Sequence, residues 1–172
     1  MQLVGPHLAI RDWTNGDAPS LARHANNRKI WINVRDRFPH PYTDEEAEQW
    51  VQHCMTADPV TDFAIEVDGV ACGGIGVMLR EDVERVSAEI GYWLGEAYWG
   101  RGLMTEAVSV FVPWAFTAFD LTRIYARVFD YNEGSARVLE KAGFVREARL
   151  RRAAIKEGRV IDEFMFAAVR EA

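Results

Sequence analysis

The stretch "AEIGYWLGEAYWGRGLMTEA", residues 88–107, decides the fold of this chain. Its first half alternates with the period of two that a strand requires, which places Glu89, Gly91 and Trp93 on one face. Its second half puts two glycines around an arginine and continues from Leu103 with helical periodicity. A strand, a glycine turn and a helix start together aim bare amide N–H groups at one point, which favours an anion such as phosphate.

Known phosphate-binding motifs narrow this interpretation. A dinucleotide-binding fingerprint needs a third glycine three residues after Gly102, where the chain has Thr105. A P-loop needs lysine and then serine or threonine after the second glycine, and Leu103 and Met104 follow instead. A plain tight turn remains the alternative to an anion site, because glycine suits sharp turns without any ligand.

The elements around this stretch predict a mixed sheet flanked by helices. Changes of hydrophobic period, capping residues and turn pairs mark their positions. Upstream we expect a strand at 8–13, helices at 15–27 and 43–57, a hairpin at 61–79 turning at Asp68-Gly69, and a strand at 85–95. Downstream we expect a helix at 103–119, a strand at 123–129, a helix at 132–144, and two strands within 148–169.

Composition indicates one soluble globular domain over residues 1–172. The net charge of −6 gives no general attraction to nucleic acid, so we expect no nucleic-acid partner. No apolar run approaches the roughly 20 residues of a spanning helix, so we expect no membrane segment. Cys54 and Cys72 form no disulfide framework, and the N-terminal stretch has no export signal, so we expect a cytoplasmic location.

Residues 88–107, followed by "NEGSARVLEKAGF" at 132–144, closely resemble the GCN5-related N-acetyltransferases (GNAT), in particular the branch that contains RimJ and RimL. "RDRFPHPYT" and "EGRVIDEFMFA" extend the likeness over nearly the whole chain. The resemblance implies an α/β (α+β) fold with a mixed, mostly antiparallel sheet of about seven strands and about four helices, in the order β-α-α-β-β-β-α-β-α-β-β.

The resemblance also implies acetyl-CoA as cosubstrate. Its pantetheine arm would pair with the strand end at Trp93 and Leu94, and Asn132 would contact the same arm. Ala97 departs from the glutamine or arginine that the family often has at its position. The loop and helix start would bind the pyrophosphate, mostly through backbone amides, with Gly100, Arg101, Gly102, Leu103, Met104 and Thr105.

Two side chains are candidates for the proton transfers of acetylation. Ser135 matches the family's Asn-x-x-Ser and would protonate the CoA thiolate, while an exposed hydroxyl is the alternative. Glu89 is the candidate general base, because a carboxylate on that strand face could reach the amine through water. An ion pair with an arginine such as Arg127 is the alternative for Glu89, and a plain helix cap is the alternative for Asn132.

The remaining predictions concern the acceptor. Trp31, Asp36 and Phe38 lie where family members build the acceptor site, with core and loop-cap roles as alternatives. The histidines lack metal-ligand spacing, so we expect no metal. We expect direct acetyl transfer to a primary amine, best a protein or peptide N-terminal α-amine. A polyamine or antibiotic amine is the alternative acceptor, and a non-catalytic acyl-CoA-binding module is the alternative of another class. A homodimer would be ordinary for the family.

Overall fold

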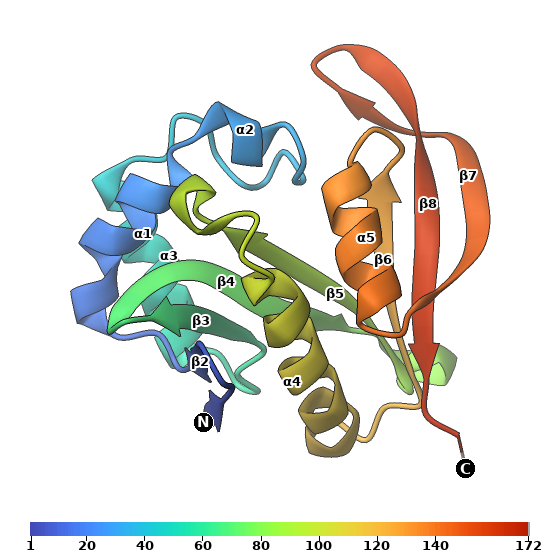
Figure 1. Ribbon diagram of the computed structural model, residues 1–172, viewed down its shortest axis with the longest axis horizontal. Coiled ribbons are helices and arrows are strands. Elements are labelled where there is room, and N and C mark those ends of the chain that lie inside the picture. The colour runs from blue at the N-terminus through green and yellow to red at the C-terminus, as the bar shows by residue number, and fades with distance from the viewer. Residues whose placement is uncertain (172) are drawn as a thin grey trace.

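The computed structural model describes residues 1–171 and shows an eight-stranded sheet with helices on both faces (Figure 1). The strand order is β1-β2-β3-β4-β5-β6-β8-β7, and only β5 and β6 pair in parallel. The strands are β1 Gln2–Val4, β2 Ala9–Arg11, β3 Asp62–Val67, β4 Val70–Leu79, β5 Ser87–Leu94, β6 Arg123–Phe129, β7 Val145–Lys156 and β8 Arg159–Val169. The predicted mixed, mostly antiparallel sheet is confirmed.

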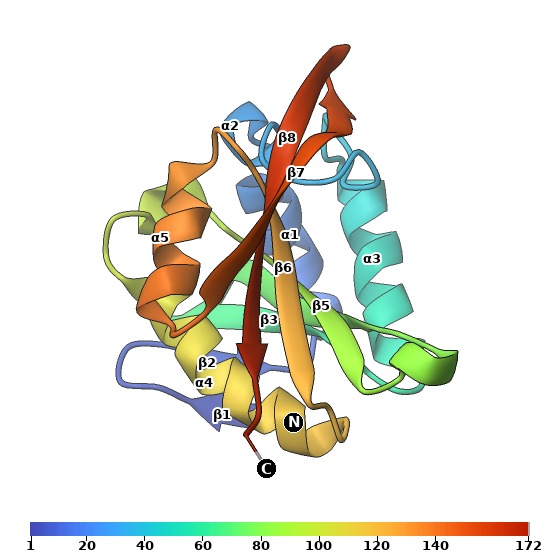
Figure 2. The ribbon, with the colours of Figure 1, turned by 90° about the vertical axis from the view of Figure 1, so that its right-hand side faces the viewer.

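Five α-helices cover the two faces of this sheet. They are α1 Ala18–Ala25, α2 Arg28–Trp31, α3 Asp44–Thr56, α4 Leu103–Ala118 and α5 Glu133–Lys141. Figure 2 shows α3 on one side of the sheet and α4 and α5 on the other. One core cluster, which includes Ile90 and Phe111, fills the α4 side, and a second cluster, which includes Trp13 and Val51, fills the side of α1 and α3.

The N-terminal third contains one strand and one helix more than the sequence predicted. The expected strand at 8–13 is the shorter β2, and an additional strand, β1, precedes it and pairs with it. Strands of three residues are too short to show a period. The expected helix at 15–27 ends at Ala25 and a second one begins at Arg28. Asn27 separates them, because its side chain accepts the Lys29 N–H at 2.8 Å and so caps a new helix.

Other local signals predicted their elements well. Thr43 and Glu46 form the predicted capping box at the start of α3. Asp68 (φ 50°) and Gly69 (φ 77°) make the predicted turn between β3 and β4. Glu157 and Gly158 have the same left-handed conformation between β7 and β8.

The centre of the sheet opens where β5 and β6 diverge. They pair only at Ser87–Glu89 with Arg123–Tyr125, and the rest of β5 has no partner on that side among residues 1–171. Backbone groups of a strand without a neighbour remain free to pair with an extended ligand. The fold therefore leaves a strand edge open in its middle, next to the start of α4.

Candidate active site

A cleft of about 1290 Å³ runs through this opening from one face of the sheet to the other. One half is lined by the end of β5, the start of α4 and one side of α5. The other half is lined by the segment after α2, one side of α3, and the face of β4 and β5 that carries Glu89 and Gly91. A pocket that joins both faces can hold two substrates end to end.

The glycine turn supplies six unused amides to the first half. Gly100 (φ 73°) and Gly102 (φ 76°) are left-handed, and a Cβ at either position would meet no atom within 4 Å. Within residues 1–171, the N–H groups of residues 100–105 donate to no other group of the chain. Free amides, open space and the positive end of α4 fit a pyrophosphate.

Besides the two glycines, four loop residues were predicted to bind the pyrophosphate, and three of them line the cleft. Leu103, Met104 and Thr105 line the cleft together with the glycines. Arg101 lies outside the lining formed by residues 1–171, and its guanidinium stacks 5.7 Å from the Tyr98 ring centroid.

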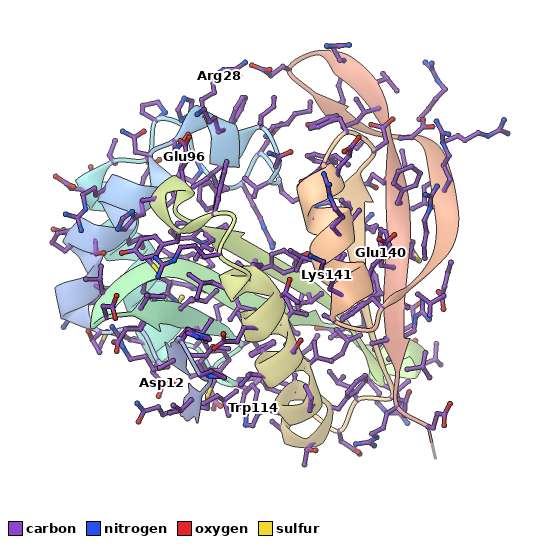
Figure 3. All side chains as sticks on the ribbon, viewed as in Figure 1. Asp12, Arg28, Glu96, Trp114, Glu140 and Lys141 are labelled. Carbon is purple, nitrogen blue, oxygen red and sulfur yellow. The ribbon has the colours of Figure 1, made fainter. Side chains whose placement is uncertain are left out.

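Helix α5 contributes positive charge that the sequence motif did not reveal. Arg137 and Lys141 line the cleft one turn apart, and Figure 3 labels Lys141 on this helix. Arg137 also pairs with Glu133 on the exposed side of α5, with 3.2 Å between Nη2 and Oε2. The sequence does contain these two basic residues at i, i+4 spacing, but only the packing of α5 beside α4 places them next to the glycine loop.

Asn132, Ser135 and Tyr92 meet beside the unpaired part of β5. The Asn132 side chain caps α5 by accepting the Ser135 N–H at 3.1 Å, and both residues line the cleft. The Ser135 hydroxyl lies 2.7 Å from the Tyr92 hydroxyl, and burial raises the pKa of Tyr92 above its ordinary value. A phenol that keeps its proton fixes the serine hydroxyl at the edge of the cleft.

Trp93 and Leu94 end β5 with their backbone along the opening. Leu94 is in register with Gly73, and its carbonyl accepts the Trp99 indole N–H at 2.7 Å. The Trp93 side chain lies on the opposite face of the sheet from Tyr92, where its ring centroid is 5.7 Å from that of Phe38. Both residues line the cleft, at the junction of its two halves.

Glu89 is held in a cluster of two buried acids and three half-buried arginines. Its Oε1 accepts Arg35 and Arg127 at 3.2 Å each, and its Oε2 accepts Arg80 at 2.9 Å and Arg127 at 3.1 Å. Arg35 also bridges to Glu163 at 2.7 Å. A carboxylate has about four acceptor positions, so arginine N–H donors occupy all those of Glu89. The structure thus shows the ion pair with Arg127 that was the alternative to a base.

The predicted acceptor residues divide between two places. Phe38 lines the cleft and also packs 5.0 Å from the Tyr42 ring. Trp31 and Asp36 are not among its lining residues within 1–171. They hold the buried Lys156 instead, whose ammonium lies 3.8 Å from the Trp31 ring centroid and 2.7 Å from Asp36 Oδ1. Lys156 lies on β7, far from these two residues in sequence, so the local pattern could not predict that they contact it.

Cysteine, metal and membrane features are simple in the described chain. Both cysteines are buried, which raises the pKa of Cys54 to about 12 and that of Cys72 to about 11. Residues 1–171 bring no group of three or more metal-ligating His, Cys, Asp or Glu side chains together. No helix within the same residues has the length and apolarity to span a membrane.

Comparison with known proteins identifies the family. The family model for the acetyltransferase (GNAT) domain matches residues 7–145. The chain is 39% identical over 177 residues to "Uncharacterized N-acetyltransferase p20" of Bacillus licheniformis, covering 98% of this chain and 96% of that protein. It is 36% identical over 154 residues to "Putative ribosomal N-acetyltransferase YdaF" of Bacillus subtilis, covering 86% and 83%. The chain therefore belongs to the GNAT acetyltransferases and is an acyltransferase.

Solved structures show the same fold. RimL, a ribosomal L7/L12 α-N-protein acetyltransferase in complex with coenzyme A, superposes with a TM-score of 0.86 at 21% identity, covering 98% of each chain. Mycobacterium smegmatis RimJ in complex with CoA-disulfide gives 0.85 at 24% identity, covering 98% of this chain and 86% of that one. The predicted GNAT fold and the likeness to the RimJ/RimL branch are confirmed.

Proposed function

We propose that this protein transfers the acetyl group of acetyl-CoA directly to the α-amine at the N-terminus of a protein or peptide. The observation that supports it best is the charge of the cleft. Its lining contains six basic side chains, Lys29, Arg35, Arg37, Arg127, Arg137 and Lys141, against three acidic ones, Glu46, Asp62 and Glu89. The whole chain, in contrast, has a net charge of −6.

A basic cleft in an acidic protein suits a phosphate-bearing cosubstrate and disfavours a polycationic acceptor. A peptide N-terminus carries one titratable amine, with a pKa of roughly 7.7 to 8.0, so roughly one molecule in ten is already neutral near pH 7. Such an acceptor demands less base catalysis than a lysine-like amine.

Each step of the transfer has a candidate group in the cleft. Acetyl-CoA supplies the activated thioester, with its pyrophosphate on the amides of residues 100–105 and its pantetheine arm along Trp93 and Leu94. The backbone N–H of Leu94 would stabilise the oxyanion, and Ser135, held by Tyr92, would protonate the departing thiolate. The high pKa values of both cysteines support direct transfer, because a protonated, buried thiol is a poor nucleophile.

A small polyamine is the second candidate acceptor. The chain is 31% identical to spermidine N(1)-acetyltransferase of Escherichia coli, but only over 88 residues, 51% of this chain. The basic surplus in the cleft argues against an acceptor of several positive charges.

The test is a turnover screen with acetyl-CoA, in which free thiol release is followed for N-terminal peptides, spermidine and an aminoglycoside. Peptides with a free N-terminus are expected to give the highest kcat/KM, and the same peptides with a blocked N-terminus serve as matched controls. Preference for spermidine would overturn the proposed acceptor. Acetyl-CoA binding without turnover of any amine would instead indicate a binding module.

A further inference from the structure

One row of the sheet crosses the acceptor half of the cleft almost without side chains. Asp62 on β3 is in register with Gly76 on β4, and Gly76 with Gly91 on β5, so all three face the same side. Gly91 is exposed in the middle of the sheet, and a Cβ there would meet no atom within 4 Å. The row is a strip of bare backbone that leads from Asp62 to the unpaired end of β5.

The neighbouring rows wall this strip on both sides. The Trp93 indole folds over Gly74 on one side, so that a Cβ at Gly74 would lie 2.8 Å from the indole nitrogen. Met78 and Glu89 form the row on the other side, and Arg37 lies 2.9 Å from the Met78 sulfur. An acceptor that approaches the end of β5 from this face must therefore pass over Gly91.

Two carboxylates, Glu89 and Asp62, border the strip, and their surroundings differ. Glu89 accepts four arginine N–H donors and has no acceptor position left. Within residues 1–171 the Asp62 side chain accepts one hydrogen bond, from the Thr61 hydroxyl at 3.0 Å. Asp62 therefore has acceptor positions free for an ammonium.

The Asp62 carboxylate also leans toward β5. A Cβ at Gly76 would overlap its Oδ1, which places the carboxylate over the neighbouring strand. Strands are about 4.8 Å apart, so the remaining distance to the backbone of Gly91 is on the order of 5 Å. An amine over Gly91 would be within reach of Asp62 directly or through one water.

The charges around Asp62 are few. Arg37 from the segment after α2 and His53 from α3 face it and lower its pKa in part, as does the Thr61 hydroxyl. The Cys54 thiol of α3 is also near. Burial is the largest influence and raises the pKa of Asp62 above its ordinary value, which makes the carboxylate a better proton acceptor.

We propose that Asp62, and not Glu89, binds the acceptor's primary ammonium and takes its proton. The inference rests on the proposed acetyltransferase function and adds the acceptor subsite to it. The ammonium transfers one proton to the Asp62 carboxylate, and the resulting neutral amine attacks the thioester carbonyl. Collapse of the adduct breaks the C–S bond, the second proton of the nitrogen passes to the thiolate through Ser135, and Asp62 returns its proton to solvent.

The first test compares Asp62→Asn with wild type, using whichever amine the wild type acetylates best. At pH 7 we expect kcat/KM for the amine to fall by about 10² to 10⁴, the usual contribution of a positioned base, with acetyl-CoA affinity unchanged. The loss should shrink toward pH 9, because an α-amine with a pKa near 8 then loses its proton without help.

Stability separates this role from a structural one. Because burial raises the pKa of Asp62, the folded state binds this proton more tightly than the unfolded chain does. The ionised carboxylate therefore destabilises the fold once the pH exceeds the pKa that Asp62 has in the unfolded chain. A neutral asparagine should therefore leave Tm at pH 7 equal or higher. A lower Tm together with weaker acetyl-CoA binding would assign the loss to the fold and overturn the proposal.

Two further variants complete the test. Gly91→Ala should raise KM for the amine several-fold and leave acetyl-CoA affinity unchanged, because its methyl group fills the strip. Glu89→Gln should not show the loss of kcat/KM at pH 7 that recovers toward pH 9, because Glu89 is not the base.

The proposal is overturned if Asp62→Asn keeps wild-type kcat/KM for the amine, whichever amine is used. Wild-type preference for another amine would overturn only the peptide acceptor, and no turnover of any amine would overturn both.

Discussion

The two halves of the cleft are built from different parts of the polypeptide. The half at the start of α4 is made mostly of backbone, from the amides of residues 100–105 and the edge of β5. The acceptor half is made of side chains from segments far apart in sequence, including Phe38, Asp62 and Trp93. A backbone site needs only glycines and a helix start in order, whereas a side-chain site needs long-range folding. The predictions below test this contrast, from the largest expected effect to the smallest.

Gly102→Glu should abolish detectable acetyl-CoA binding, because the new side chain and its negative charge would enter the space above the free amides. Isothermal titration calorimetry measures this directly. Gly69→Glu is the matched control, since Gly69 has the same left-handed conformation (φ 77°) in the turn between β3 and β4. Equal losses in both variants would mean that backbone strain, and not a phosphate site, explains Gly102.

Ser135→Ala should lower kcat by about 10² to 10⁴ while acetyl-CoA affinity stays within about twofold. Steady-state thiol release gives both values. Ser109→Ala, on the exposed side of α4, is the control and should have wild-type kcat. Tyr92→Phe should have a smaller effect that disappears in the Ser135→Ala background, because the two hydroxyls act as one unit. Additive effects would contradict the pairing.

Glu163→Gln should lower the free energy of unfolding by about 1 to 3 kcal/mol, because loss of a buried carboxylate removes a charged partner of Arg35 and Arg127. Urea denaturation measures this. Glu147→Gln, whose exposed carboxylate pairs with Arg123, is the control and should change stability by at most about 1 kcal/mol. Similar values for both variants would show that the cluster does not hold the acceptor half together.

Lys156→Met should raise KM for the acceptor a few-fold and leave acetyl-CoA affinity unchanged. The lysine binds the Val34 carbonyl at 2.9 Å and Asp36, and so fixes the segment that carries Phe38. Figure 3 shows Arg28 at the same end of the molecule, and its Nη2 lies 2.5 Å from Glu157 Oε1 in an exposed pair. Arg28→Met is therefore the control, with little expected effect. A change in acetyl-CoA affinity in Lys156→Met would contradict the independence of the two halves.

Local sequence predicted most of the fold. The capping box at Thr43, the turn at Asp68-Gly69 and the alternation along residues 87–94 each act over a few residues, so their structural result is readable from the chain. The short strand β1 and the break at Asn27 were missed, because three-residue elements have no measurable period and a capping asparagine resembles any loop asparagine.

The sequence predicted the backbone part of the candidate site better than the part made of side chains from distant segments. The order of strand, glycine turn and helix at residues 88–107 determined the fold and the free amides of the turn, since glycine conformation and helix-end geometry are local properties. Tertiary structure alone decided that Glu89 is saturated by arginines from three segments, that Trp31 and Asp36 hold Lys156, and that Asp62 faces the bare strip at Gly91. These relations depend on strand register and chain packing over long separations, which no local period encodes.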